Sequence, residues 1–293
     1  MKKSHRRGDL LAVASHLLSA VFPFVAATSL QQMGVLKASF LFYCIATVFV
    51  VFFTYKRVGI KELYRALERN RSFLWAITFF VGGAIAYYGG LASTKNVLAF
   101  VLLSRLDWVM QIPVAIVLLR EKARPLAVVA AILACCGAVL VGWTSRIDVD
   151  TAVWALIYVG LSVVAYTLTK PLLRTELSAD SVLALRAYGV TLILGIMNAC
   201  SVQGLGGNAF EVTPSAILAG VMLATLFATR FSAISSIPLW RFAAYAPIQA
   251  FVAVLISTWL GQAASFLVIM GMLLIAVGEG LVAIEEYGKS QAT

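Results

Sequence analysis

The stretch VLLSRLDWVMQIP, at 101–113, interrupts an apolar segment with Arg105, Asp107 and Gln111. Arg105 and Asp107 are ionisable, and Gln111 follows one turn later. The N–H donors of a guanidinium form a planar fork that matches carboxylate and phosphate groups. Asp107 could hold an ammonium group or carry a proton. A charge at the centre of a membrane helix costs at least about 2.5–3.5 kcal/mol, so each charged residue here requires a partner or a function.

The spacing of these residues separates them on a helix. Asp107 lies about 200° around the helix axis from Arg105, so the two cannot pair on one face. The side chains instead form two stripes, which are Ser104–Asp107–Gln111 and Arg105–Trp108–Ile112. One stripe faces a cavity and the other faces a neighbouring helix, and the sequence leaves open which is which.

The composition indicates that helices crossing a membrane must position these residues. Of 293 residues, 61% are hydrophobic and 12% are charged, and the mean hydropathy is +0.94. Soluble domains are about 45–50% apolar and about 25% charged. Because a span needs about 20 apolar residues, the sequence predicts an all-α integral membrane protein with ten transmembrane helices. We expect them near 9–30, 35–54, 73–92, 97–119, 126–143, 153–170, 182–200, 214–229, 233–257 and 263–283.

The distribution of Lys and Arg predicts the orientation. With a cytoplasmic N-terminus, 17 of them fall on the inner side, Lys170 and Arg230 included, and three fall outside. Short cytoplasmic loops carry such an excess. We therefore expect both termini to be cytoplasmic. The net charge of +10 is then a topology signal, and no nucleic-acid partner is expected.

An internal repeat divides the predicted spans. Residues 92–142 align without gaps on 228–278, which places Arg105 on Arg241. We therefore expect two five-helix repeats, over 1–146 and 147–293. Because five is odd, the repeats must have opposite orientations, and inverted repeats with a midplane site are typical of secondary transporters.

The two aligned arginines are the first candidates for a binding site. Each lies eight residues into its predicted helix, or about 12 Å deep. The alternative for each is an ion pair with a carboxylate on another helix. Trp108 and Tyr245 place an aromatic ring near each arginine and suit the body of a ligand, or they simply pack.

At this point the sequence resembles a known family. VLLSRLDWVMQIPVAIVLLREKARPLAVVAAILACCGAVLVGW is similar to the fourth and fifth helices of the EamA type of the drug/metabolite transporter (DMT) superfamily. LWRFAAYAPIQAFVAVLISTWLGQAASFLVIMGMLLIAVG resembles the matching part of the second repeat. LALRAY, at 183–188, resembles the start of the seventh helix, which carries an arginine. The resemblance implies ten spans in two five-helix EamA-like repeats and export of amino acids or related metabolites.

Further candidate residues complete the predicted site. The resemblance implies that Arg186 points inward, whereas its place near a helix end would also let it reach water. Tyr88 and Tyr166 are additional candidates for substrate binding. Asp107 and Glu279 are the candidates for proton coupling, and Glu279 is equally compatible with a structural role.

These observations predict a secondary transporter that exports a small anionic or zwitterionic, amino-acid-like metabolite by alternating access. A flippase for a phosphate-bearing lipid and a cationic-drug efflux protein are the alternatives. No enzyme is expected, since the chain has two histidines and no HExxH or GxSxG grouping. No catalytic residue, metal or cofactor is expected. The expected partners are a small-molecule substrate and the lipid bilayer of a bacterial cytoplasmic (inner) membrane, with the protein a monomer or a homodimer.

Overall fold

The computed structural model describes residues 2–54, 71–121, 148–175, 178–201 and 212–261, with scattered residues of 125–140 and 266–278. Helix is the only regular secondary structure in these segments. The helices are α1 (Lys2–Met33), α2 (Val35–Thr54), α4 (Arg71–Ser93), α5 (Val97–Ser104), α6 (Leu106–Val117), α8 (Val149–Thr175), α9 (Ala179–Cys200), α11 (Pro214–Ser236), α12 (Leu239–Ala243) and α13 (Ala246–Trp259).

Eight helical stretches of the described segments are long and apolar enough to cross a membrane. Two of them are composite, since α5 with α6 and α12 with α13 each form one stretch. The chain is therefore an all-α integral membrane protein, as predicted, and these stretches correspond to eight of the ten predicted spans. The other two, at 126–143 and 263–283, fall largely outside the described residues. The count of ten and the two-repeat division stay predictions.

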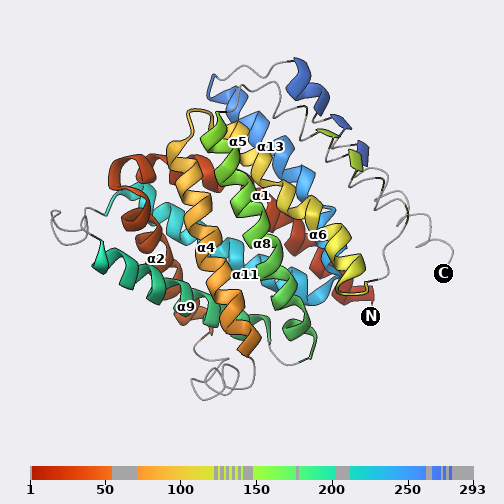
Figure 1. Ribbon diagram of the computed structural model, residues 1–293. Helices are drawn as coiled ribbons and strands as arrows, with labels where there is room; N and C mark the ends of the chain where they lie inside the picture. The colour runs from red at the N-terminus through yellow and green to blue at the C-terminus, as the bar shows by residue number, and fades with distance from the viewer. Residues whose placement is uncertain are drawn as a thin grey trace.

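The helices form a layered bundle in which α4 and α8 cross in front of α1 and α11 (Figure 1). The closest pairs are α1 with α11 and α4 with α8. On one side α2 packs between α9 and α11. This arrangement encloses a space that α1, α2, α4, α8, α9 and α11 all border.

Polar side chains cap the starts of four helices. Asn96 accepts a hydrogen bond from the backbone N–H of Ala99 at α5, and Ser178 does the same from Ser181 at α9. Thr213 caps α11 just ahead of Pro214, and Asp148 accepts from Thr151 at 2.7 Å in α8. Such caps satisfy backbone donors that have no partner within the helix. They explain why these helices begin at short polar segments.

Small residues allow helices to approach closely at two points. A Cβ built on Gly90 would lie 2.2 Å from Phe100 Cε2 and 2.8 Å from Trp154 Cβ. A Cβ on Gly220 would lie 2.6 Å from Ile45 Cβ. Helices in membranes associate largely through such packing, because lipid gives little hydrophobic drive between them. These two glycines therefore fix the spacing of α4 against α8 and of α2 against α11.

Candidate binding cavity

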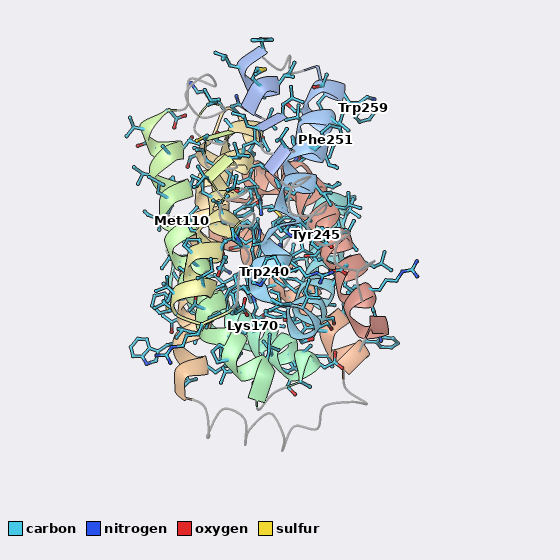
Figure 2. The ribbon with its side chains drawn as sticks, turned by 90° about the vertical axis from the view of Figure 1, so that its right-hand side faces the viewer. Met110, Lys170, Trp240, Tyr245, Phe251 and Trp259 are labelled. Atoms are coloured by element: carbon cyan, nitrogen blue, oxygen red, sulfur yellow. The ribbon has the colours of Figure 1, made fainter. Side chains whose placement is uncertain are left out.

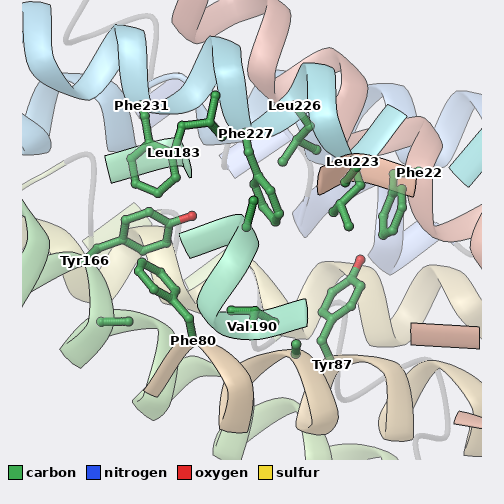
Figure 3. Close-up of a cluster of buried hydrophobic side chains, with 14 of the residues drawn as sticks. Phe22, Phe80, Tyr87, Tyr166, Leu183, Val190, Leu223, Leu226, Phe227 and Phe231 are labelled. Carbon is green, nitrogen blue, oxygen red and sulfur yellow. The ribbon is translucent and has the colours of Figure 1, made fainter. Parts of the chain in front are cut away.

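A cavity lies among the spans, near the middle of their lengths. Its empty volume, with the open side included, is about 550 Å³. Its lining is mostly aromatic and aliphatic, with three arginines, Arg105, Arg186 and Arg230. Figure 3 shows the hydroxyl groups of Tyr87 and Tyr166 turned toward this space from two ends, with Phe227 between them. The cavity is thus an apolar chamber with a few convergent polar groups, as small-molecule sites usually are.

Arg186 enters the cavity from α9 between two phenyl rings. Its guanidinium carbon lies 3.8 Å from the centroid of Phe80 and 3.8 Å from that of Phe227. Its Nη1 donates to Tyr166 Oη at 3.4 Å, and its Nε has no hydrogen-bond partner in the described part of the chain. The side chain is 6% exposed, so it points inward and does not reach water from the helix end.

Arg230 enters from α11 and makes the most hydrogen bonds of the three arginines. It donates to Tyr166 Oη at 2.8 Å, to Ser19 Oγ at 2.8 Å and to Ser15 Oγ at 3.4 Å. Its guanidinium also lies over the ring of Trp108, 5.1 Å from the centroid. Each of these partners is neutral, so they orient the cation without balancing its charge.

Arg105 lies at a break in its span. Its backbone, at φ −77° and ψ −9°, ends α5 and begins α6, and its N–H bonds to Leu102 O instead of continuing the α-helical pattern. The side chain donates to Tyr87 Oη at 3.4 Å, and its Nε has no partner among the described residues. The break brings this arginine to the cavity at the depth where Tyr87 and Tyr158 also lie.

Asp107 lies behind the cavity wall, against α8. Its Oδ2 accepts hydrogen bonds from Tyr158 Oη at 3.1 Å and from Ser162 Oγ at 3.0 Å. Gln111, on the same stripe, donates to the backbone carbonyls of Ser162 and Val163. Asp107 and Gln111 therefore face a neighbouring helix, and of the other stripe Arg105 alone lines the cavity.

Two aromatic candidates lie close to the arginines. Trp108 is fully buried, and its ring centroid lies 5.1 Å from that of Tyr166 and 5.6 Å from that of His16. Tyr88 lines the cavity beside Phe22 and Phe42. His16 is also fully buried, and its Nε2 lies 3.1 Å from Phe242 O.

Arg241 does not lie at the cavity. Its Nε and Nη2 donate to the two oxygens of Asp9, at 2.9 and 2.8 Å, and both side chains are about one-fifth exposed. The predicted depth was wrong because α11 continues to Ser236 and the next span begins only at Leu239. Arg241 therefore lies in the first turn of its span. It forms an ion pair with a carboxylate on another helix, which was the alternative to a binding role.

Tyr245 is also separate from the cavity lining. It is half-buried at the break between α12 and α13, on the face of the molecule shown in Figure 2. The structure thus places the aligned residues Arg105 and Arg241 in different environments. The coupling candidate Glu279 falls outside the described residues.

Two residues assigned to inner loops are buried instead. Arg230 lies within α11 and is 4% exposed. Lys170 lies within α8, and its Nζ donates to the backbone carbonyls of Ile234 and Ile237 at the end of α11. The assignment was wrong because the predicted sixth span stopped at 170 and the predicted eighth at 229, whereas α8 continues to Thr175 and α11 to Ser236. The apolar residues that follow Arg230, in FSAISSI, were the signal that the helix continues.

A second cluster of contacts holds the junction between α11 and α12. Glu121 Oε2 accepts hydrogen bonds from the backbone N–H groups of Leu239, at 3.0 Å, and Trp240, at 3.4 Å. Lys170 binds the other side of the junction, and Figure 2 shows it near Trp240. With the Asp9–Arg241 pair, these contacts close the bundle at the end expected to be cytoplasmic.

No protein-family model matches the chain, and no curated protein matches it. In contrast, 29 chains of solved structures are similar to it. One, described as "Crystal structure of protein", has a TM-score of 0.73 at 15% sequence identity. The match covers 96% of this chain and 98% of that one. At this identity the likeness shows a shared fold, which extends over nearly the whole chain.

Fold and site together define a class. The protein is an all-α integral membrane protein with a cavity among its spans and buried cations on the cavity wall.

Proposed function

We propose that the protein is a secondary transporter that moves a small organic anion across the membrane by alternating access. The observation that carries the proposal is the group of three buried arginines on one cavity. Buried charges within membrane spans are costly, and they commonly mark substrate or ion pathways. Among the described residues, the hydrogen-bond and ring partners of the arginines are hydroxyl groups and aromatic rings, and the one buried carboxylate nearby is Asp107, so a bound anion would supply further negative charge.

The charge of the cavity bears on the substrate class. Three guanidinium groups favour a carboxylate or phosphate and oppose the entry of a cationic drug. An amino acid would place its carboxylate at an arginine, whereas Asp107, the expected partner of its ammonium, lies behind the cavity wall. A phosphate-bearing lipid would satisfy the same arginines, so lipid flipping is the second candidate. The mostly aromatic lining favours the small molecule.

The position of the cavity supports alternating access. Helices on both sides of the predicted repeat boundary at 146/147 contribute to its wall. A substrate held between two such halves is released to either side when one half rocks against the other. Asp107 is the described candidate for proton coupling. We further propose that the direction is export and that the protein, with cytoplasmic termini, lies in an inner membrane without acting as an enzyme.

Uptake into proteoliposomes tests this proposal. The full chain is reconstituted, and entry of radiolabelled amino acids, dicarboxylates, phosphate esters and a cationic dye is compared with entry into empty vesicles. We expect at least one anion to accumulate in a saturable manner, and the cation not to enter. Saturable uptake of the cation alone would overturn the proposal.

Arginine variants connect uptake to the cavity. Arg105→Gln, Arg186→Gln and Arg230→Gln each remove one charge-assisted donor group, which contributes about 1.5–3 kcal/mol. We therefore expect each to weaken substrate affinity roughly 10–100-fold. Arg6→Gln, at an exposed position of α1, is the matched control and should transport as wild type does. Folding of each variant is checked by gel filtration and thermal unfolding.

A further inference from the structure

Two of the three arginines converge on one oxygen atom. Arg186 and Arg230 come from different helices, and both donate to Tyr166 Oη, at 3.4 and 2.8 Å. The phenol oxygen accepts both bonds, so its own O–H remains available as a third donor. Two cationic forks and one hydroxyl proton are thus directed at the same small region of the cavity.

The charges around this region do not balance. Asp107 is fully buried behind the wall, where its carboxylate accepts hydrogen bonds from Tyr158 and Ser162. In the described part of the chain, the hydrogen-bond and ring partners of Arg186 and Arg230 are serine and tyrosine hydroxyls and aromatic rings, which carry no net charge. Among the described residues of this region, three arginines are therefore set against one carboxylate, and two of the three lie at Tyr166. Like charges held close together away from bulk water repel strongly.

We infer that the substrate carries a compact dianion, a phosphate monoester group, held between Arg186 and Arg230 beside the Tyr166 hydroxyl. The inference rests on the proposed transport function and names its substrate class. A phosphate group offers several oxygens around one centre, so both forks can bind it together, and guanidinium geometry matches it. Two separate carboxylates would require two separate forks, whereas these two meet at one point.

The remainder of the cavity indicates what the phosphate is attached to. Tyr43, Tyr87, Tyr88 and Tyr158 all line the wall beyond the arginine pair. The hydroxyls of Tyr43, Tyr87 and Tyr88 can donate to a hydroxylated body, and that of Tyr158, which donates to Asp107, can accept from one. The substrate class is therefore the phosphate monoester of a small hydroxylated molecule.

A pair of probes that differ by one methyl group tests the charge requirement. Methyl phosphate is a dianion at pH 8, because the second pKa of such monoesters is about 6, whereas dimethyl phosphate stays a monoanion. Calorimetry on the detergent-purified full chain compares these two with glycerol 3-phosphate, succinate and alanine. We expect the two monoesters to bind at least about tenfold more tightly than dimethyl phosphate. Equal affinity of methyl and dimethyl phosphate, or tighter binding of succinate, would overturn the inference.

Conservative variants test the location of the site. Arg186→Lys and Arg230→Lys keep the charge but lose the fork, and Tyr166→Phe removes only the hydroxyl. Each should weaken glycerol 3-phosphate binding several-fold or more, and Arg6→Gln should not. Unchanged affinity in all three folded cavity variants would place the phosphate elsewhere and contradict the inference.

Uptake by proteoliposomes separates the two proposals. Saturable uptake of alanine or succinate without uptake of glycerol 3-phosphate would support the transport function and contradict the phosphate monoester as substrate. Tight binding of glycerol 3-phosphate without any uptake would support the phosphate-binding site and contradict the transport function. Uptake of glycerol 3-phosphate that depends on Arg186 and Arg230 would support both.

Discussion

The junction between α11 and α12 offers a sharp test of how the expected cytoplasmic end is held closed. Glu121 Oε2 accepts two backbone N–H bonds there, at 3.0 and 3.4 Å, and the side chain is 7% exposed. Glu121→Ala leaves both N–H groups buried without this acceptor. An unsatisfied buried donor costs about 1–3 kcal/mol, and the 3.4 Å bond is the weaker one. We therefore expect a loss of about 2–4 kcal/mol in the free energy of unfolding.

The isosteric variant separates charge from geometry. Glu121→Gln keeps an oxygen in place, and a charge-assisted bond is roughly twice as strong as a neutral one. Its loss should be about half that of Glu121→Ala. Denaturant unfolding in detergent micelles measures both, with Asp150→Ala, at an exposed position of α8, as the control within about 0.5 kcal/mol. Equal losses for the Gln and Ala variants would refute the role of the carboxylate charge, and no loss for Ala would refute the cap itself.

Three further predictions concern other contacts. A double-mutant cycle with Asp9→Asn and Arg241→Gln should give a coupling of about 0.2–1 kcal/mol, because the pair is partly exposed, and a coupling near zero would contradict the ion pair. Gly90→Ala should lower the free energy of unfolding by about 1–3 kcal/mol, because the added methyl group overpacks against Phe100. Gly160→Ala is the control, since a Cβ there would have no atom within 4 Å, and it should cause no loss. Equal losses in the two variants would contradict the close contact at Gly90. The Thr151 hydrogen bond holds the pKa of Asp148 below its ordinary value of 3.8, so its stabilisation is full above that value and is lost as the pH falls through the lowered pKa. Acid unfolding should show this loss in wild type, and its persistence in Asp148→Asn would rule out that carboxyl as the source.

Hydropathy predicted much of the fold because a membrane span is a long apolar segment. Arg105 was also predicted as a deep cation, since apolar residues surround it on both sides. Arg230 was missed because the polar residues of TRFSAISS resemble a loop when the chain is considered in isolation. In the bundle, Ser15, Ser19 and Tyr166 satisfy this arginine, and these partners come from two other helices.

The face that each side chain presents could not be predicted from helical periodicity alone. The break at Arg105 changes the helical phase between α5 and α6. Side-chain directions calculated at about 100° per residue therefore do not hold across it. The end of α11 at Ser236 likewise determines that Arg241 begins a span instead of lying deep within one. The convergence of Arg186 and Arg230 on Tyr166 arises from the packing of three helices, which sequence spacing does not encode.

The surplus of positive charge in the cavity has a practical consequence for work with the purified protein. Small buffer anions would act as counter-ions for the arginines, and anything that binds the folded state alone raises its apparent stability. Sulfate or phosphate in a purification buffer would thereby stabilise the protein and, at the same time, compete with every ligand under study. Affinities measured in phosphate buffer would be too weak, and a chloride or organic sulfonate buffer at fixed ionic strength is the appropriate reference.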